Sequence, residues 1–444
     1  MESMNGPLAG MRGIVLTQAW AGTYCTELLA FMGADLIQIE VRQRPDVWRG
    51  SYDAPFAGRM SDIATAEHPW NCNFLYNSVN LNKRCLTLNL QHPEGLAIFK
   101  RLLPFADFVV ENFSPRVLGN LGIGYEAMCE LKPDIILCSL SAYGHSGPWA
   151  NIPGIGGTIE PTSGMSALLG YPDGAPMNSG QMYPDAVAGL NGFAAVMTAL
   201  RHRQQTGKGQ YIDLSMQEAN LVFVGDAALE YLRTGEQRPR RGNRHPLWAP
   251  HGIYRCAGIE RWIAIACESE PQWAALQQAL GNRALQRPEF ANNQSRKANE
   301  DALDAAIESA TETSDRDKLV SALLSLGVIA APVLNALEVA SDPGLRARKA
   351  VVTVSHPEAG EWPQAAIPWH YSALSNPSLR PAPRLGEHSA EVLSELLGTT
   401  AAEYEALVSA GVSGTGPLTE GCPACPDSHL QGTRRRHASI FARH

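Results

Sequence analysis

A glycine-rich stretch, residues 147–170, contains six glycines, three prolines and a single ionisable side chain, Glu160. A carboxylate that is held in place can act as a nucleophile and form a covalent intermediate, which splits one difficult step into two easier ones. The glycines of residues 154–157 remove steric barriers to a close approach of the backbone. Glu160 is therefore a candidate reagent. A structural alternative is that Glu160 caps a helix that starts at Pro161, because proline disfavours helix at the residue before it and suits a first turn.

A second carboxylate, Asp185, stands at the start of a long run of small and apolar residues. This run predicts one largely buried helix, with Arg201 and Arg203 in its last turn and Gly207 near its end. An aspartate at an N-cap accepts hydrogen bonds from free backbone N–H groups. The position of Asp185 therefore has an explanation that needs no chemistry.

The predicted elements that position these residues alternate between strand and helix. Short β-branched runs at residues 12–17 and 34–41 flank a helical segment, and the pattern repeats through a helix at residues 93–103. Such alternation predicts an α/β fold with a mostly parallel, doubly wound sheet. Ligands of these folds bind beyond the carboxyl ends of the strands, which here means after Thr17, Glu40, Glu111 and Ser141.

The chain is long enough for more than one core, and its texture changes near residue 225. Residues 1–225 are expected to form the first part of a large domain, and residues 226–330 a smaller α+β domain. Residues 331–412 are expected to return to the large domain. Residues 413–444 lack hydrophobic periodicity, which predicts a disordered tail.

The composition argues against several classes of partner. A net charge of −8 and a pI near 5.9 disfavour nucleic acids and anionic membranes as partners, and no apolar run reaches membrane-spanning length. Nine cysteines, an odd number without a disulfide framework, predict reduced thiols and a cytoplasmic protein. Cys422 and Cys425 lack a second pair, so no metal site is predicted. No nicotinamide, flavin or nucleoside triphosphate motif is present.

Eight segments form a joint pattern: GIVLTQAWAGTYCTELLAFMGADLIQIEV, YNSVNLNKRCLTLNLQHPEG, ADFVVENFSPRVLGNLGIGYEAM, SAYGHSGPW, YPDAVAG, HRQQTGKGQYIDLSMQEA, GVIAAPV and LGEHSAEVLSELLG. Their order, from near residue 12 to about residue 398, resembles the family III coenzyme A (CoA) transferases of the CaiB/BaiF type. The resemblance implies a Rossmann-like large domain, an inserted smaller α+β domain and an interlocked dimer. It also implies transfer of CoA from an acyl-CoA donor to a small carboxylic acid, through an enzyme-bound anhydride and an enzyme thioester. The CoA thioester is then a substrate, and no tightly bound cofactor is expected.

The resemblance also implies where the coenzyme binds. Guanidinium groups suit phosphates, and an aromatic ring with an amide suits the face and edge of adenine. The familiar helix arginine is replaced by Asn120 in ENFSPRVLGNLG. Arg116, four residues earlier on the same helix face, is expected to take over its contact. The expected coenzyme-binding residues are Gln18, Ala19, Arg42, Arg84, Asn112, Phe113 and Arg116.

A larger departure concerns the nucleophile. Members of the family commonly read like GPYADRPGYDLVAQAMSGL, in which the aspartate attacks the thioester. An ungapped alignment with GPWANIPGIGGTIEPTSGM places Gly156 at that aspartate and Glu160 at the glutamine four residues later.

Three interpretations stay open at this point. Glu160 attacks in place of the aspartate, or the chain is a non-nucleophilic subunit of a heteromer with a paralogous chain, or Glu160 only caps a helix. Asp185 resembles in position an acid/base aspartate of the branch that racemises 2-methylacyl-CoA, and it is the second catalytic candidate. That branch carries a His-Asp pair where this chain has Ile155 and Gly156, which disfavours racemisation.

Overall fold

The computed structural model describes residues 5–44, 46–50 and 66–418. The chain divides into two compact units. Unit 1 comprises Met1–Ser163, Gln181–Val222 and Lys349–His444, and unit 2 comprises Gly164–Gly180 and Phe223–Arg348. Unit 2 thus contains residues 226–330, for which the sequence predicts a small domain, together with further segments on both sides.

Unit 1 is built around a six-stranded sheet in which all neighbouring strands are parallel. The strand order is β3-β2-β1-β4-β5-β6, so the winding of the chain reverses between β1 and β4. The predicted α/β class with a mostly parallel sheet is confirmed. The strands are β1 (Arg12–Leu16), β2 (Asp35–Glu40), β3 (Arg84–Thr87), β4 (Phe108–Glu111), β5 (Ile136–Ser141) and β6 (Gln210–Ser215).

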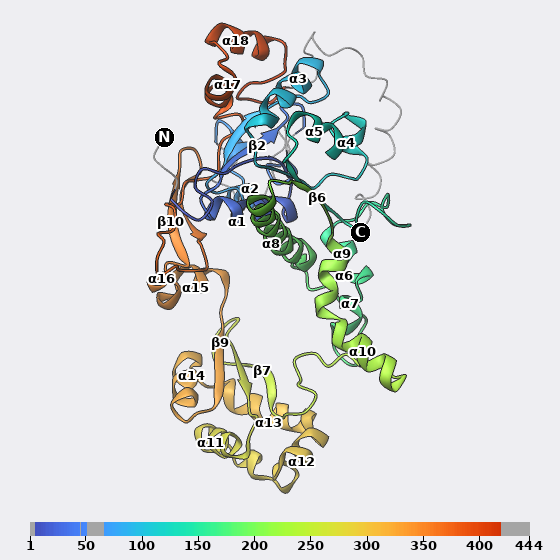
Figure 1. The fold of residues 1–444 in the computed structure, drawn as a ribbon. Coiled ribbons are helices and arrows are strands. Elements are labelled where there is room, and N and C mark those ends of the chain that lie inside the picture. Colours follow the sequence, from blue (N-terminus) through green and yellow to red (C-terminus); the bar gives the residue numbers. More distant parts are fainter. Residues whose placement is uncertain (1–4, 45, 51–65, 419–444) are drawn as a thin grey trace, which may run out of the picture. The chain divides into compact units, whose positions relative to one another are not determined.

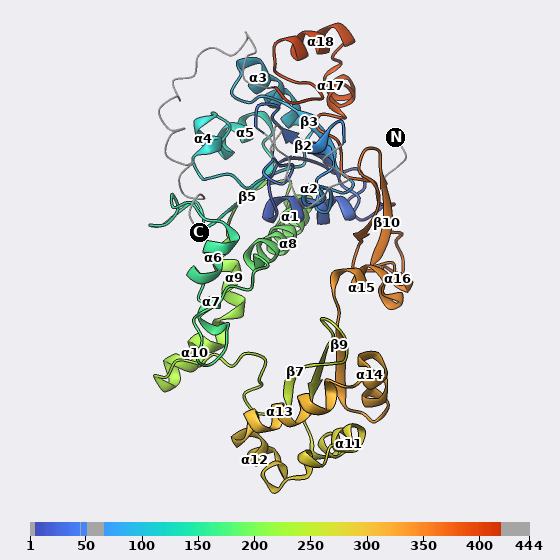
Figure 2. The same cartoon turned by 180° about the vertical axis from the view of Figure 1, so that it is seen from behind.

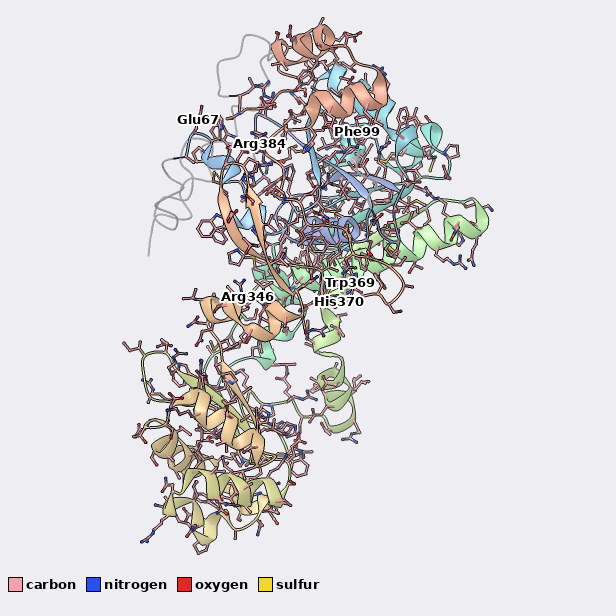
Figure 3. All side chains as sticks on the ribbon, turned by 90° about the vertical axis from the view of Figure 1, so that its left-hand side faces the viewer. Glu67, Phe99, Arg346, Trp369, His370 and Arg384 are labelled. Carbon is pink, nitrogen blue, oxygen red and sulfur yellow. The ribbon has the colours of Figure 1, made fainter. Side chains whose placement is uncertain are left out.

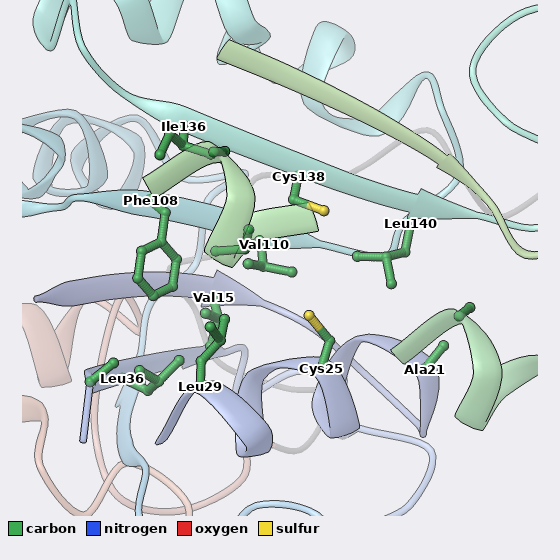
Figure 4. Close-up of a cluster of buried hydrophobic side chains, with 14 of the residues drawn as sticks. Val15, Ala21, Cys25, Leu29, Leu36, Phe108, Val110, Ile136, Cys138 and Leu140 are labelled. Atoms are coloured by element: carbon green, nitrogen blue, oxygen red, sulfur yellow. The ribbon is translucent and has the colours of Figure 1, made fainter. Parts of the chain in front are cut away.

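One face of this sheet packs against α1 (Ala21–Phe31) and the long helix α8 (Tyr183–Thr206) (Figure 1). Figure 4 shows side chains of α1, such as Cys25 and Leu29, beside Val15 and other buried residues of the strands. The two helices also approach each other closely, because a Cβ atom on Gly189 would lie 2.9 Å from the carbonyl oxygen of Ala21. The start of α1 is therefore fixed against α8.

The opposite face of the sheet packs against a second set of helices. Phe99, Met128 and Val392 from three of these helices belong to one buried cluster with Ile37 and Leu137 of the strands. The helices of this face are α3 (Pro93–Leu102), α4 (Val117–Asn120), α5 (Tyr125–Leu131), α17 (Ser389–Leu397) and α18 (Ala401–Ser409). The remaining helices of unit 1 are α2 (Phe74–Asn77), α6 (Gly156–Thr162) and α9 (Met216–Asn220), with short 3-10 helices at Pro69–Asn71 and Leu103–Phe105.

The C-terminal part of the chain returns to this sheet. The antiparallel pair β10 (Val351–His356) and β11 (Gly360–Ala365) comes first, and the Trp369 ring, labelled in Figure 3, then stacks on Phe193 of α8 with a centroid separation of 6.1 Å. The hydroxyl of Ser389 accepts a hydrogen bond from the backbone N–H of Thr87 at 3.1 Å. Distant parts of the sequence therefore share one core.

The end of the described chain is also part of the fold. Ser413 is fully buried, and the backbone N–H of Gly414 donates to the hydroxyl of Thr87 at 2.9 Å. The backbone N–H of Leu418 donates to the carbonyl oxygen of Arg42 at 3.0 Å. The expected start of the disordered tail at residue 413 is therefore too early. Residues 419–444, which include Cys422 and Cys425, lie outside the described residues.

Unit 2 has its own antiparallel sheet and its own core. The sheet order is β7-β8-β9, and Figure 2 shows β7 and β9 with α13 and α14 beside them. Trp273, Phe290 and Ile307 are among the buried side chains of this core. Within the described ranges, no helix has both the length and the apolar character needed to cross a membrane. The strands are β7 (His251–Arg255), β8 (Trp262–Ala266) and β9 (Ile329–Val333), and the helices are α7 (Met165–Leu168), α10 (Gly225–Thr234), α11 (Glu270–Leu280), α12 (Asn293–Ala298), α13 (Glu300–Thr311), α14 (Arg316–Ser325), α15 (Ala336–Ser341) and α16 (Pro343–Ala347), with 3-10 helices at Arg283–Gln286 and Pro288–Phe290.

Candidate active site

The turn that follows β1 is joined to the end of β4 by two reciprocal hydrogen bonds. The backbone N–H of Gln18 donates to Oδ1 of Asn112, and Nδ2 of Asn112 donates to the carbonyl oxygen of Gln18, both at 2.8 Å. Three of the predicted coenzyme-binding residues, Gln18, Ala19 and Asn112, therefore lie together at the carboxyl edge of the sheet. The amide of Asn112 holds the backbone of the turn, and its predicted contact with the edge of an adenine stays a prediction.

Gly156, the first residue of α6, lies directly beside the carboxyl group of Asp185 in the first turn of α8. A Cβ atom on Gly156 would be 2.1 Å from Oδ2 of Asp185 and 2.7 Å from Cβ of Met182. Both separations are far shorter than van der Waals contact. The space that a side chain at residue 156 would need is therefore occupied by Asp185.

The carboxyl group of Asp185 has an unusual environment. Its Oδ2 atom is buried and makes no hydrogen bond with the described residues. Burial raises the pKa of Asp185 to about 6, against the opposing effect of hydrogen bonds from the backbone of Ala21 and of Asp185 itself. Because Ala21 begins α1 and Asp185 lies near the start of α8, the carboxylate is close to the positive ends of two helices. A perturbed carboxyl group with an unsatisfied oxygen marks a candidate for chemistry.

Glu160 lies on the same helix as Gly156, one turn further along. The separation of four residues places both on one side of α6. Glu160 is only 1% exposed, and α6 packs against α8 and α9. The helix begins at Gly156 with Pro161 inside it, so the interpretation of Glu160 as the cap of a helix starting at Pro161 is wrong.

Phe113 and Arg116 follow β4 and lie near the same edge. The backbone N–H of Phe113 donates to Oε2 of Glu111 at 2.7 Å, and its half-buried ring packs on the core beneath α4 and α5. Arg116 is exposed, and its Nε donates to Oδ1 of Asn151 at 2.8 Å. Its backbone carbonyl accepts from the N–H of Asn120 at 2.9 Å, so the two residues are one helical turn apart, as predicted.

Arg42 and Arg84, by contrast, bind other parts of the chain. Arg42 donates to the carbonyl oxygens of Ser413 and Gly416, each at 2.5 Å. Arg84 is 4% exposed in its side chain and forms an ion pair of 2.7 Å with Glu395. Both guanidinium groups hold the C-terminal return in place, so we do not carry them into the proposed coenzyme site.

A cluster of polar atoms at the ends of β4 and β5 was not among the predicted site residues. Oε1 of Glu111, the hydroxyls of Ser139 and Ser141, and Nε2 of His145 are buried without a hydrogen-bond partner among the described residues. Burial raises the pKa of Glu111 to about 7, and its Oε1 lies 3.9 Å from Nε2 of His145. The signal in the sequence was a glutamate that ends an otherwise apolar strand.

Known proteins support the resemblance to the CoA transferases. Residues 8–389 match the family described as CoA-transferase family III. The chain is 31% identical over 397 residues to the succinate–glutarate CoA-transferase of Agrobacterium fabrum, an alignment that covers 89% of this chain and 97% of the relative. It is also 31% identical over 398 residues to the beta subunit of the succinyl-CoA–L-malate CoA-transferase of Chloroflexus aurantiacus, covering 88% and 94% of the two chains.

A crystal structure of a CaiB/BaiF family protein from Brucella suis superimposes with a TM-score of 0.78. The two proteins are 30% identical, and the match covers 88% of this chain and all of that one. The resemblance seen in the sequence is thus confirmed by family, by relatives and by fold. The chain belongs to CoA-transferase family III.

Proposed function

We propose that this protein is a CoA-transferase that moves CoA from an acyl-CoA donor to a small carboxylic acid. The support is its family membership and the names of its relatives, which refer to succinate, glutarate and L-malate. CoA thioesters are then substrates, and no tightly bound cofactor takes part. A location in the cytoplasm stays a prediction.

We assign the attack on the donor thioester to Asp185. The observation that carries this assignment is the buried, unpartnered Oδ2 atom beside Gly156. An oxygen without an internal partner keeps its lone pairs for an incoming carbonyl carbon, and weak solvation makes an ionised carboxylate more reactive. The replacement of a nucleophilic aspartate by Gly156 stays a prediction. Under our proposal, Asp185 supplies the carboxylate from the neighbouring helix.

The reaction then proceeds through an anhydride and a thioester formed on Asp185. Oδ2 of Asp185 attacks the donor carbonyl carbon, the C–S bond breaks, and CoA leaves as a thiolate, which gives a mixed anhydride. The thiolate attacks the aspartyl carbonyl carbon, the donor acid leaves as a carboxylate, and Asp185 carries CoA as a thioester. The acceptor carboxylate attacks the aspartyl carbonyl carbon of this thioester and displaces the CoA thiolate, which gives a second mixed anhydride. The thiolate then attacks the acceptor acyl carbon of this anhydride. Acceptor-CoA leaves and the Asp185 carboxylate is restored.

The N-terminus of α1 favours these steps. The backbone of Ala21, at the start of α1, lowers the pKa of the Asp185 carboxyl group, and the dipole of α1 is positive at this end. Negative charge builds up on the oxygen atoms of each tetrahedral intermediate. Fixed donors at such positions stabilise that charge without reorganisation.

Glu160 and a non-nucleophilic role are the alternatives. Glu160 is buried on the same side of α6 as Gly156, which favours a contribution of this second carboxyl group to the site. The similarity to a beta subunit favours a chain that binds acyl-CoA and completes the site of a paralogous partner. Racemisation of 2-methylacyl-CoA is the weakest alternative, because Ile155 and Gly156 replace the His-Asp pair of that branch.

We propose that the chain acts as a dimer, either with a second copy or with a paralogous subunit. The support is an apolar side of α10 on which Leu229 and Leu232 are 69% and 79% exposed. Exposed apolar side chains grouped on one helix are typical of a protein interface. Light scattering of the purified protein should give twice the mass of the chain, and a monomeric mass would contradict the homodimer.

Trapping of the covalent intermediate tests the assignment. The purified protein is mixed with succinyl-CoA, treated with hydroxylamine or borohydride, digested and analysed by peptide mass spectrometry. We expect the modification on Asp185, its loss in Asp185→Asn and its retention in Glu160→Gln. A modification on Glu160 would transfer the role to that residue, and CoA binding without any adduct would favour the partner-dependent subunit.

A further inference from the structure

The turn between β1 and α1 contains a residue in a strained conformation. Ala19 has a φ of 56°, in the left-handed region that non-glycine residues rarely adopt. Such a conformation is kept only where the surroundings enforce it. The turn also carries the predicted coenzyme contacts, so its shape matters for the proposed reaction.

Asp46 supplies a large part of this enforcement. Its Oδ1 and Oδ2 atoms both accept from the backbone N–H of Ala19, at 3.1 and 3.2 Å. Oδ1 also accepts from the backbone N–H of Trp48 at 2.8 Å, which anchors the carboxylate to its own loop. Asp46 is only 3% exposed, so water does not replace these bonds easily.

The turn is therefore held from two directions. Asn112 at the end of β4 binds both backbone groups of Gln18, and Asp46, six residues after the end of β2, binds the next N–H along the chain. The side chains of Trp20 and Trp48 also meet, with ring centroids 5.8 Å apart. Side chains that follow two different strands thus fix successive residues of one turn.

The turn held by Asn112 and Asp46 also leads directly to the helix start beside the proposed nucleophile, Asp185. Two residues after Ala19, Ala21 opens α1, and its backbone lowers the pKa of the Asp185 carboxyl group against the larger effect of burial. The close approach at Gly189 keeps this end of α1 against α8. A relaxation of Ala19 would therefore shift the turn that contacts the coenzyme, while the packed helix start resists the movement.

We propose that Asp46 is a positioning residue, which holds the left-handed turn at Ala19 in the conformation that binds the CoA part of the substrate. This inference rests on the proposed function for the identity of the ligand. Asp46 itself touches no reacting atom. It acts through the backbone of Ala19.

Asp46→Asn tests the inference, because the amide keeps the size of the side chain but removes its charge and replaces one of the two oxygens that accept from Ala19 by an N–H group. We expect the Kd for CoA, measured by calorimetry, to rise about tenfold, as expected for release of one strained residue. In an Ala19→Gly background, glycine adopts the left-handed conformation without help. The same Asp46→Asn change should then raise Kd by a factor of about three or less.

The controls separate this role from a loss of stability and from a failure of the proposed function. Asp35→Asn removes a carboxylate at the opposite end of β2, where it pairs with Arg84, so it should lower the thermal midpoint without changing Kd. An unchanged Kd in Asp46→Asn, or an equal rise in the Ala19→Gly background, would overturn the inference. A native protein that does not bind CoA at all would instead overturn the proposed function.

Discussion

Gly156 and Asp185 lie so close that a Cβ atom at residue 156 would be 2.1 Å from Oδ2 of the Asp185 carboxyl group. The two residues come from the first turns of α6 and α8. Their contact links the absence of one side chain to the position of another. A side chain at residue 156 and the carboxyl group of Asp185 would thus need the same space.

Gly156→Ala should damage this site. The added Cβ atom meets Asp185 and Met182 at distances that force one of them to move. We expect transferase activity to fall at least about tenfold, with stability lower by about 1–3 kcal/mol as for overpacking elsewhere. Gly157→Ala is the matched control, because a Cβ atom there has no neighbour within 4 Å. Equal activities of the two variants, measured with succinyl-CoA, would contradict the proposed geometry.

The rate of intermediate formation should depend on the ionisation of Asp185. Its pKa is raised to about 6, and only the carboxylate attacks. We expect the single-turnover rate of adduct formation to rise with pH up to about 6 and to level off above about 7. Rapid quench at saturating acyl-CoA from about pH 5 to about pH 8 measures this profile. A rate that stays constant across the lower part of this range would assign the step to another group.

The same raised pKa lowers the stability of the folded protein at neutral pH. A carboxyl group with a higher pKa in the folded state holds its proton more tightly there, so the free energy of unfolding falls as pH rises from about 4 to about 6. Asp185→Asn should therefore increase the free energy of unfolding at about pH 7 by about 1 kcal/mol, after allowance for partial exposure, and hardly at all at about pH 4. Urea titrations at both pH values distinguish this effect from better packing, which would appear equally at both.

Arg116 should contribute to the binding of a phosphate of CoA. Its guanidinium group is exposed at the carboxyl edge of the sheet and makes one described hydrogen bond, to Asn151. Arg116→Ala should weaken CoA binding about fivefold, as for one exposed charged contact. Binding of pantetheine, which has no phosphate, should not change. Arg201→Ala, near the C-terminal end of α8, is the control for a general effect of charge. An equal loss of CoA affinity in this variant would contradict a specific contact between Arg116 and a phosphate.

Arg84 should matter for stability and not for coenzyme binding. Its buried guanidinium group pairs with Asp35 and Glu395, and both carboxylates keep only the more exposed Arg12 as a described ion-pair partner once Arg84 is removed. Arg84→Met should lower the free energy of unfolding by about 3 kcal/mol, whereas Arg12→Met, at a more exposed partner of Asp35, should lower it by less. The Kd for CoA should stay the same in both. A specific loss of CoA affinity in Arg84→Met would restore Arg84 to the coenzyme site.

The sequence by itself determined the family and the class of fold. Alternating strand and helix patterns follow from local hydrophobic periodicity, and periodicity sets which face of each element is buried. The parallel sheet of unit 1 and the long helix α8 are therefore visible in the sequence. The strand ends at Thr17 and Glu111 likewise indicated the edge at which Gln18, Asn112 and Phe113 gather.

The local sequence did not determine which charged groups are available to a ligand. Arg42 and Arg116 both follow strands and both suit a phosphate by type. Arg42 donates to carbonyl groups of residues 413–416, which are far away along the chain, whereas Arg116 stays exposed. Such a difference depends on long-range packing, which no local pattern encodes. The boundary of the tail was misplaced for the same reason, because Ser413 is buried by distant residues.

The tertiary structure alone decided how the carboxyl groups of the site are arranged. An ungapped reading of the glycine-rich stretch pointed to Glu160, because sequence spacing compares positions only along one segment. The fold brings Asp185 from a different helix into the space beside Gly156, removes water from its Oδ2 atom and raises its pKa. Residue types set which chemistry is available, whereas desolvation and the contact between two helix ends set the environment of each carboxylate.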